Sequence, residues 1–351
     1  MRYVNIKMLL ITIILAGLIG SCKQHRQTTR AFYLWKTTFE GDSIEKKVLT
    51  ELQVKKLYIK LFDVTWNNEQ ERPEPAAKIL FERTALSWLN QSAIEIIPTV
   101  FITNETLEKI KPETIGELGE RINSLLRNFL GEYNIRNVTE IQIDCDWTAS
   151  TKEKYFELLR FLKSLPNFIS RQLSVTIRLY QCKYYNKTGV PPANRGLLMC
   201  YNMGNLKDPG TNNSILETAE LKKYTDNLNA YPLPLDIALP LFEWIVLFRK
   251  NTFKGIITKL PDSFLQNTQL FKSRENNYEL LTDTVLNGYE VKKGDVLRKE
   301  ASRYDELLKA TAVLSPQLLT PNFTISLYHL DSSTISKFKK DELEAIYNSL
   351  H

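Results

Sequence analysis

Apolar residues recur along this 351-residue chain at two different spacings. Short segments with an apolar residue at every second position predict β-strands, and longer segments with apolar residues three or four positions apart predict amphipathic helices. Strands are predicted at 32–36, 56–63, 94–102, 140–148, 173–178, 196–201, 235–242 and 323–328. Helices are predicted at 43–53, 75–90, 112–130, 150–162, 215–229, 299–314 and 333–349.

The alternation of strands and helices predicts an α/β fold, a (β/α)₈ TIM-type barrel over residues 31–351. The strand faces support closure, because Ile141 and Ile143 share one face while Gln142 and Asp144 share the other. An open sheet covered by helices on both sides would require two apolar faces. The polar faces should line the barrel interior, whose candidate charged residues are Lys60, Asp144, Asp146, Arg178 and Asp236.

The segment between the seventh and eighth strands is longer than one crossover helix requires. Its part at about 251–300 contains an apolar run at Phe253–Ile257 and a hairpin pattern at Gly288–Val296. We therefore expect an insertion at this point, placed to cover the mouth of the barrel.

The N-terminal segment has the pattern of a targeting signal. Arg2 and Lys7 precede an apolar stretch, Met8–Ile19, that is too short to span a membrane comfortably. The following residues, Leu18–Cys22, resemble a bacterial lipobox, which implies that residues 1–21 are a signal peptide, that Cys22 is lipidated and that 22–30 form a tether. Lys23 implies sorting to the outer membrane. The alternative is an ordinary signal peptide or anchor whose Cys is incidental.

The net charge of +6 comes mostly from the N-terminus. Residues 1–30 contain five basic residues and no acidic one, which leaves 41 basic residues against 40 acidic ones in the body. No dense Lys/Arg run with interleaved aromatic residues is present, which argues against a nucleic-acid partner. We expect no cofactor, no metal site and a monomeric protein.

Of the three histidines, His25 lies in the tether and His351 is the last residue, which leaves His329 for the folded body. This argues against a multi-His zinc site and against Ser-His or Cys-His catalysis. The body contains three cysteines, Cys145, Cys182 and Cys200, in or at the ends of predicted strands. Two interpretations remain open for them: buried apolar thiols, or one disulfide in an oxidising compartment.

The stretch Gln142–Trp147, followed by Tyr155, Leu158–Leu159 and Leu173–Thr176, resembles an uncharacterised family of bacterial barrel-like lipoproteins. It is also remotely similar to the chitinase-type glycoside hydrolases of family 18. The fourth strand of those enzymes reads D-x-x-D-x-D-x-E, where the last Glu is the catalytic acid, and their sixth strand carries M-x-Y-D.

This second resemblance is incomplete. Asp144 and Asp146 match the second and third Asp, whereas Thr148 stands where the catalytic Glu belongs. Met199–Asn202 matches M-x-Y-D with Asn in place of Asp, and Leu239–Trp244 resembles the seventh strand. The resemblance implies a glycan ligand, but a threonine cannot protonate a leaving group near neutral pH, so the family mechanism cannot run here unchanged.

Three carboxylates are candidate catalytic residues. Asp144 and Asp146 lie on one strand face, where two close carboxylates can raise one pKa and so provide an acid beside a base. The alternative is an internal ion-pair network with Lys60 and Arg178. Glu243 follows the seventh strand and is a candidate acid or nucleophile; its alternative is a surface or ion-paired Glu.

Residues at the predicted carboxyl ends of the strands are candidates for ligand binding, because function collects at that rim of a barrel. Aromatic rings there can stack on sugars, or they can simply pack in the core. His329 is a candidate base or hydrogen-bond donor, or a structural residue. The predicted binding residues are Trp35, Lys60, Asp63, Trp147, Arg178, Tyr180, Tyr201, Asn202, Trp244 and His329.

These features predict a lipid-anchored protein of the bacterial cell envelope with three possible roles. The first is a glycan-active enzyme that uses Asp144 and Asp146 with Glu243. The second is a non-catalytic protein that binds a glycan or cell-wall polymer on the same barrel. The third is an assembly partner for another protein.

Overall fold

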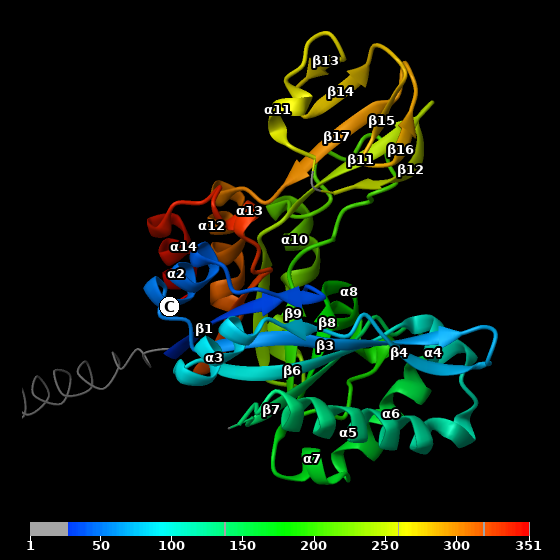
Figure 1. The fold of residues 1–351 in the computed structure, drawn as a ribbon, viewed down its shortest axis with the longest axis vertical. Coiled ribbons are helices and arrows are strands. Elements are labelled where there is room, and N and C mark those ends of the chain that lie inside the picture. Colours follow the sequence, from blue (N-terminus) through cyan, green and yellow to red (C-terminus); the bar gives the residue numbers. More distant parts are fainter. Residues whose placement is uncertain (1–26, 137, 259, 319, 351) are drawn as a thin grey trace, which may run out of the picture.

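A computed structural model describes residues 27–350, except 137, 259 and 319. Eight parallel strands form a closed barrel in the order β1-β18-β10-β9-β8-β7-β6-β3, and β1 also pairs with β3. This confirms the predicted barrel (Figure 1). Its strands are β1 (Gln27–Leu34), β3 (Lys56–Asn67), β6 (Glu95–Ile102), β7 (Glu140–Cys145), β8 (Gln172–Arg178), β9 (Arg195–Met199), β10 (Leu235–Pro240) and β18 (Asn322–Tyr328).

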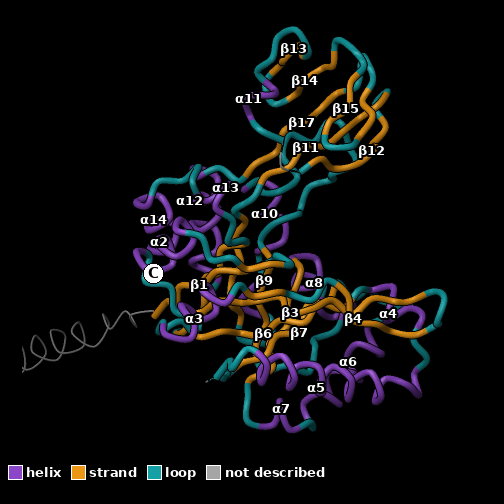
Figure 2. Tube along the Cα trace, viewed as in Figure 1, coloured by secondary structure: helices purple, strands orange, loops and turns teal. Residues whose placement is uncertain are grey.

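Helices surround the barrel and bury their apolar faces against it (Figures 1 and 2). Those between barrel strands are α2 (Ser43–Glu51), α3 (Arg83–Gln91), α4 (Asn104–Lys109), η2 (Pro112–Thr114), α5 (Ile115–Glu132), α6 (Lys152–Lys163), α7 (Pro166–Ile169), α8 (Leu179–Lys183), α9 (Tyr185–Thr188), α10 (Thr218–Thr225) and η3 (Leu228–Ala230). Those after the insertion are α12 (Tyr304–Leu314), η4 (Ser315–Gln317), α13 (Ser332–Ile335) and α14 (Lys340–Asn348).

The alternation along β7 positions its polar residues inside the barrel. Ile141 and Ile143 are fully buried in the large core that the barrel shares with its helices. Gln142 points the other way, where it accepts a hydrogen bond from the Tyr33 hydroxyl and its Nε2 donates to Ser174 Oγ at 3.4 Å. The same parity brings Asp144 into the interior near the carboxyl ends of the strands, which we call the upper end of the barrel; the amino ends form the lower end.

The lower end of the barrel interior contains paired charges. Asp236 receives two hydrogen bonds from the Arg195 guanidinium, at 2.8 and 2.7 Å, and one from the backbone N–H of Thr324 at 2.6 Å. Glu140 pairs with Lys56 at 2.8 Å. Every buried charge here has a partner of opposite sign, as burial requires.

The first strand begins earlier than the sequence pattern predicts. Gln27–Arg30, assigned above to a tether, are part of β1 and pair with β18. Polar side chains are tolerated there because none of these four residues is fully buried. The backbone still pairs with β18 along this segment. The predicted signal peptide and Cys22 lie outside the described residues. Within the described residues, no helix is both long and apolar enough to cross a membrane.

The predicted helix at 75–90 is shorter than expected. β3 is long, and the chain then turns back into β4 (Arg72–Ala76), which pairs with β3 in antiparallel fashion. The next short strand, β5 (Leu80–Phe81), pairs with β2 (Thr38–Phe39), which lies between β1 and α2 in the chain. The helix α3 begins only at Arg83. Pro73 and Pro75 therefore belong to an edge strand, where a missing N–H is tolerated.

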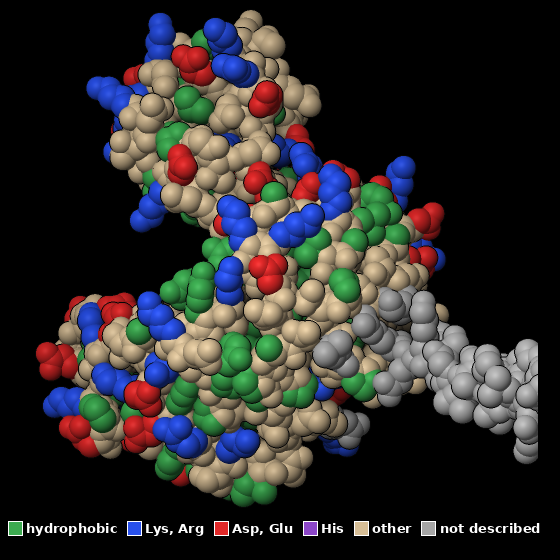
Figure 3. Space-filling model, turned by 180° about the vertical axis from the view of Figure 1, so that it is seen from behind, with side chains coloured by type: hydrophobic (Ala, Val, Ile, Leu, Met, Phe, Trp, Pro, Cys, Tyr) green, Lys and Arg blue, Asp and Glu red, His purple; other side chains and the backbone are tan. Residues whose placement is uncertain are grey.

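The insertion is a small antiparallel domain that projects from the barrel (Figure 1), and the surface is hollowed where the two meet (Figure 3). It begins with β11, several residues before the expected start at about 251, and has its own apolar core. Its elements are β11 (Glu243–Arg249), β12 (Thr252–Ile257), α11 (Asp262–Leu265), β13 (Phe271–Arg274), β14 (Asn277–Leu280), β15 (Thr284–Leu286), β16 (Tyr289–Val291) and β17 (Val296–Ala301).

A buried ion pair fixes the insertion to the barrel. Arg298 and Glu300 on β17 are at most 1% exposed and are joined at 2.7 Å. The remaining donors of Arg298 reach the carbonyls of Leu206 and Asp208, and Glu300 also accepts from the indole of Trp244 at 2.8 Å. The pair thus connects the insertion, the loop after β9 and the start of β11.

Candidate functional site

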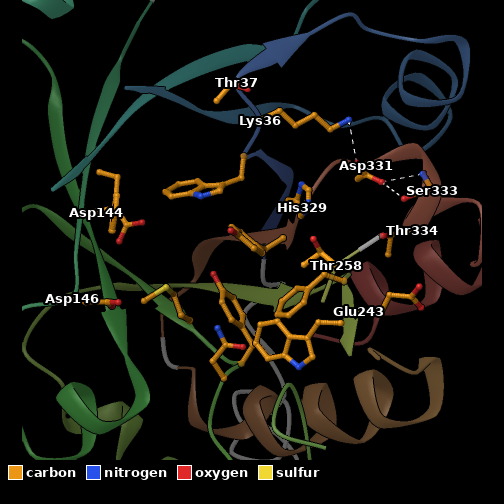
Figure 4. Close-up of a pocket in the computed structure, with 18 of the residues that line it drawn as sticks. Lys36, Thr37, Asp144, Asp146, Glu243, Thr258, His329, Asp331, Ser333 and Thr334 are labelled. Atoms are coloured by element: carbon orange, nitrogen blue, oxygen red, sulfur yellow. Dashed lines mark hydrogen bonds and ion pairs between the residues drawn. The ribbon is translucent and has the colours of Figure 1, made fainter. Parts of the chain in front are cut away.

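A pocket of about 1120 Å³ opens at the carboxyl ends of the barrel strands. Its wall is formed by residues that follow the strands and by residues of the insertion (Figure 4). Of the predicted site residues, those that line it are Trp35, Asp144, Asp146, Arg178, Tyr180, Tyr201, Asn202, Glu243, Trp244 and His329. Its size exceeds that of pockets for single small ligands, so several sugar rings would fit.

Aromatic rings form one side of this pocket. Tyr201 stacks on Tyr328 with ring centroids 5.2 Å apart, and Phe242 lies 5.2 Å from Trp244 and 5.8 Å from Tyr328. Trp35 also packs against Tyr328, at 5.8 Å. Because each ring is held by its neighbours, the wall is rigid and suited to stacking on the apolar face of a sugar.

Asp144 is the unusual charge of the pocket. It is only 8% exposed and accepts one hydrogen bond, from Thr176 Oγ1 at 2.5 Å. Burial raises the pKa of the Asp144 carboxyl to about 7; the nearby Asp146 adds to the rise, whereas Thr176 and Arg178 oppose it. Asp144 therefore exchanges its proton near neutral pH and can either donate to or accept from a ligand.

Asp146 lies on the same side of the pocket but in a different environment. Its Oδ1 accepts a hydrogen bond from Nε of Arg178, and both side chains are more than 40% exposed. The predicted alternative, an internal ion-pair network with Lys60 and Arg178, is present only in part, because Arg178 pairs with Asp146 whereas Lys60 pairs with Asp63. Arg178 holds Asp146 and leaves Asp144 as the carboxyl whose own partner is a hydroxyl.

Glu243 lies across the pocket from the two aspartates (Figure 4). Lys337 contacts it at 2.5 Å and Lys299 at 3.8 Å, and both lysines also pair with Asp262. This arrangement matches the ion-paired interpretation. Glu243 and Asp262 thus share two lysines in one ion-pair network at the pocket edge.

Thr148 does not take the place of a catalytic acid in space. Its hydroxyl contacts those of Ser150 and Thr151, and its backbone N–H donates to Thr151 Oγ1 at 2.9 Å. The side chain is exposed outside the pocket. The helix predicted at 150–162 begins at Lys152, as α6, just after these contacts.

Three predicted binding residues do not line the pocket. Trp147 is 3% exposed and packs on Tyr155 in the core, so its assignment to the rim is wrong. The alternation of β7 continues to position 147, which puts Trp147 on the same helix-facing side as Ile141 and Ile143. Lys60 and Asp63 pair at 2.8 Å behind Trp35, and the Lys60 ammonium lies 5.1 Å from its ring. They support the pocket through Trp35.

Several pocket residues were not predicted from the sequence. Lys36 bridges Glu45 at 2.5 Å and Asp331 at 3.4 Å, which joins the loops after β1 and β18 (Figure 4). Phe101 and Tyr328 also line the wall. Both lie at strand ends, so the rule used for Trp35 applied to them as well; the Lys36 cluster has no local signal.

The buried thiols and the acidic residues give no sign of a metal centre within the described part of the chain. Cys145, Cys182 and Cys200 are free and buried, which matches the simpler of the two interpretations. Among the described residues, no group of three or more His, Cys, Asp or Glu side chains could hold a metal ion.

Solved structures with the same fold include the spore cortex-lytic enzyme SleL of Bacillus cereus, with a TM-score of 0.55, 12% identity and coverage of 93% of this chain and 75% of that one. A Group IV chitinase of Ostrinia furnacalis in complex with allosamidin has a TM-score of 0.54 and 11% identity, covering 92% and 98%. A class V chitinase variant of Nicotiana tobaccum in complex with NAG4 has a TM-score of 0.51 and 9% identity, covering 93% and 100%.

Neither a family model nor a curated protein sequence matches the chain. Sequence identities this low show a shared fold alone. The resemblance noted in the sequence therefore agrees with the structure in its fold: the chain has the barrel fold that these solved structures share.

Proposed function

We propose that this protein binds a glycan of the bacterial cell envelope in the barrel-mouth pocket and does not hydrolyse it. The observation that carries the proposal is the combination of a rigid aromatic wall with a missing acid. In the sequence, Thr148 occupies the position of the acid in the resembled motif; in the structure, it lies outside the pocket. Glu243, the candidate acid on the opposite side of the pocket, is bound by two lysines.

The pocket provides both kinds of contact that sugars need. Rings such as Trp244 and Tyr201 offer apolar faces, while Asn202 and the aspartate pair offer hydrogen-bonding groups at the same surface. The chitinase structures of the same fold contain NAG4 or allosamidin in their own complexes. N-acetylglucosamine oligosaccharides and soluble cell-wall fragments are therefore the ligands to test first.

We further propose that Cys22 carries a lipid anchor, as its lipobox-like surroundings suggest, and that the protein resides at the outer membrane as a monomer. The test is mass spectrometry of the mature N-terminus and membrane fractionation, with Cys22→Ala as the control. A soluble parent protein with an unmodified Cys22 would exclude this anchoring.

Hydrolysis is the second candidate, and one observation favours it. A carboxyl with a pKa of about 7 beside a second carboxylate is the arrangement of many acid–base pairs. Asp144 could then protonate a leaving group while Asp146 stabilises positive charge on the sugar.

A single experiment separates these candidates. The purified protein is titrated with N-acetylglucosamine oligosaccharides and with cell-wall fragments in a calorimeter, and each mixture is then analysed chromatographically for shorter products. We expect heat of binding and unchanged ligand. Product that disappears with Asp144→Asn would establish the enzyme instead, and the absence of both signals would favour a protein partner. Trp244→Ala should weaken binding, because it removes part of the aromatic wall.

A further inference from the structure

Two tyrosines stand exposed beside the pocket. Tyr180, on the short helix that follows β8, lines the pocket and is 47% exposed. Tyr184 does not line the pocket; it is 42% exposed, and its ring centroid lies 4.8 Å from that of Tyr180. Large rings are seldom left this open in adjacent positions unless something covers them.

These rings are held in place. The Lys183 ammonium lies 5.5 Å from the ring centroid of Tyr184 and 5.8 Å from that of Tyr224, and it donates a hydrogen bond to the carbonyl of Lys223. Tyr224 in turn lines the pocket. The cation thus connects Tyr184 to α10 and keeps it beside the pocket edge, which lowers the entropy lost when a ligand binds.

We propose that Tyr180 and Tyr184 form a second sugar-binding surface, which receives the part of a glycan chain that extends out of the pocket. This inference rests on the proposed function. It deepens that function, because it makes the ligand an extended oligosaccharide instead of a single sugar or a disaccharide. Tyr180 belongs to both surfaces and so makes the path from the pocket to Tyr184 continuous.

The size of the surface favours a glycan over a protein. A stable protein interface buries about 1,200 Å² or more, which two side chains cannot supply. A sugar ring needs only one aromatic face and nearby hydrogen-bonding groups, and the tyrosine hydroxyls supply these.

The test compares short and long ligands. Binding of the N-acetylglucosamine disaccharide and hexasaccharide is measured calorimetrically for the parent protein, Tyr184→Ala and Tyr184→Phe. We expect Tyr184→Ala to weaken hexasaccharide binding roughly tenfold. It should leave disaccharide binding unchanged, since Tyr184 lies outside the pocket. Tyr184→Phe keeps the ring and should retain most of the affinity.

Tyr289 supplies a matched control, because it is 43% exposed on the insertion and lies outside the pocket lining. Tyr289→Ala should change neither affinity. Equal hexasaccharide binding by the parent and by Tyr184→Ala would overturn the second surface while leaving the proposed function intact. An equal loss for both ligand lengths would also overturn it. A parent protein that binds neither of these ligands nor the cell-wall fragments would refute the proposed function itself.

Discussion

Asp236 and Asp144 are both carboxylates buried inside the barrel, at opposite ends of it. Asp236 receives two hydrogen bonds from Arg195 and one from the backbone. Asp144 receives one, from a threonine hydroxyl. Burial raises the pKa of both carboxyls, but the Arg195 charge opposes the rise at Asp236 far more directly than any cation does at Asp144.

The difference distinguishes a carboxylate that is paired within the fold from one that is a candidate for function. A buried carboxylate with a bidentate cation partner holds strands together. A buried carboxyl without such a partner costs stability whenever it ionises, and proteins keep such groups where a ligand or a reaction uses them. The lower end of the barrel therefore joins its strands through paired charges, whereas the upper end keeps a costly buried carboxyl where we propose that the glycan binds.

The largest change in stability is expected on removing the Asp236 carboxylate at the lower end of the barrel. Asp236→Asn leaves the Arg195 charge without its partner and should reduce the free energy of unfolding by about 3–5 kcal/mol. Urea denaturation at pH 7 measures it. Adding Arg195→Gln should recover part of the loss, because the unpaired charge is removed. A small effect of the single substitution would mean that the two ends do not differ as described.

At the upper end, removal of the carboxyl is expected to increase the free energy of unfolding. The folded pKa of Asp144 is about 7 against 3.8 for the ordinary carboxyl, so the folded state binds more protons between pH 4 and 7, and stability falls as pH rises through that window. Asp144→Asn cannot ionise. At pH 8 it should be more stable than the parent by about 2–4 kcal/mol, with the difference vanishing near pH 4.

The control for this prediction is the neighbouring carboxylate. Asp146→Asn should change stability by less than about 1 kcal/mol, since Asp146 and Arg178 are both substantially exposed. Denaturation curves at pH 4, 6 and 8 for the parent and both variants measure how each difference in stability depends on pH. A pH-independent difference for Asp144→Asn would contradict the assignment of the titrating group.

The smallest expected effects distinguish Trp147, which packs in the core, from Trp244, which lines the pocket. Trp147→Phe loses the hydrogen bond from Nε1 to the carbonyl of Thr188 and some core volume, and should cost about 1–2 kcal/mol of stability without changing glycan affinity. Trp244→Phe should instead weaken glycan binding severalfold. Calorimetric titration with the hexasaccharide and urea denaturation, applied to both variants, test the contrast.

The sequence predicted the barrel because its parity signal is local. Alternation of polar and apolar residues within β7, β8 and β18 is visible in six residues, and it is sufficient to distinguish a barrel with a polar interior from a doubly wound sheet. The same parity puts Trp147 with Ile141 and Ile143 on the helix-facing side, where the structure has it. Its assignment to the rim was wrong because that assignment used only the position at the strand end.

The candidate site was predictable only in part. Residues at strand ends, such as Trp35 and Tyr201, were found by position alone. The environment of Glu243 was not, because Lys337 comes from a segment 94 residues away. The isolation of Asp144 likewise depends on Arg178 contacting Asp146, and no spacing in the sequence specifies which of two neighbouring carboxylates a cation will choose.

The early start of β1 has a consequence for orientation. All eight barrel strands are parallel, so Gln27 enters at the end opposite to the pocket. With the lipid anchor proposed at Cys22, the intervening chain reaches at most about 17 Å even when fully extended. The end of the barrel opposite to the pocket would then rest near the bilayer, and the pocket would face outward, toward polymers that lie beyond the lipid surface.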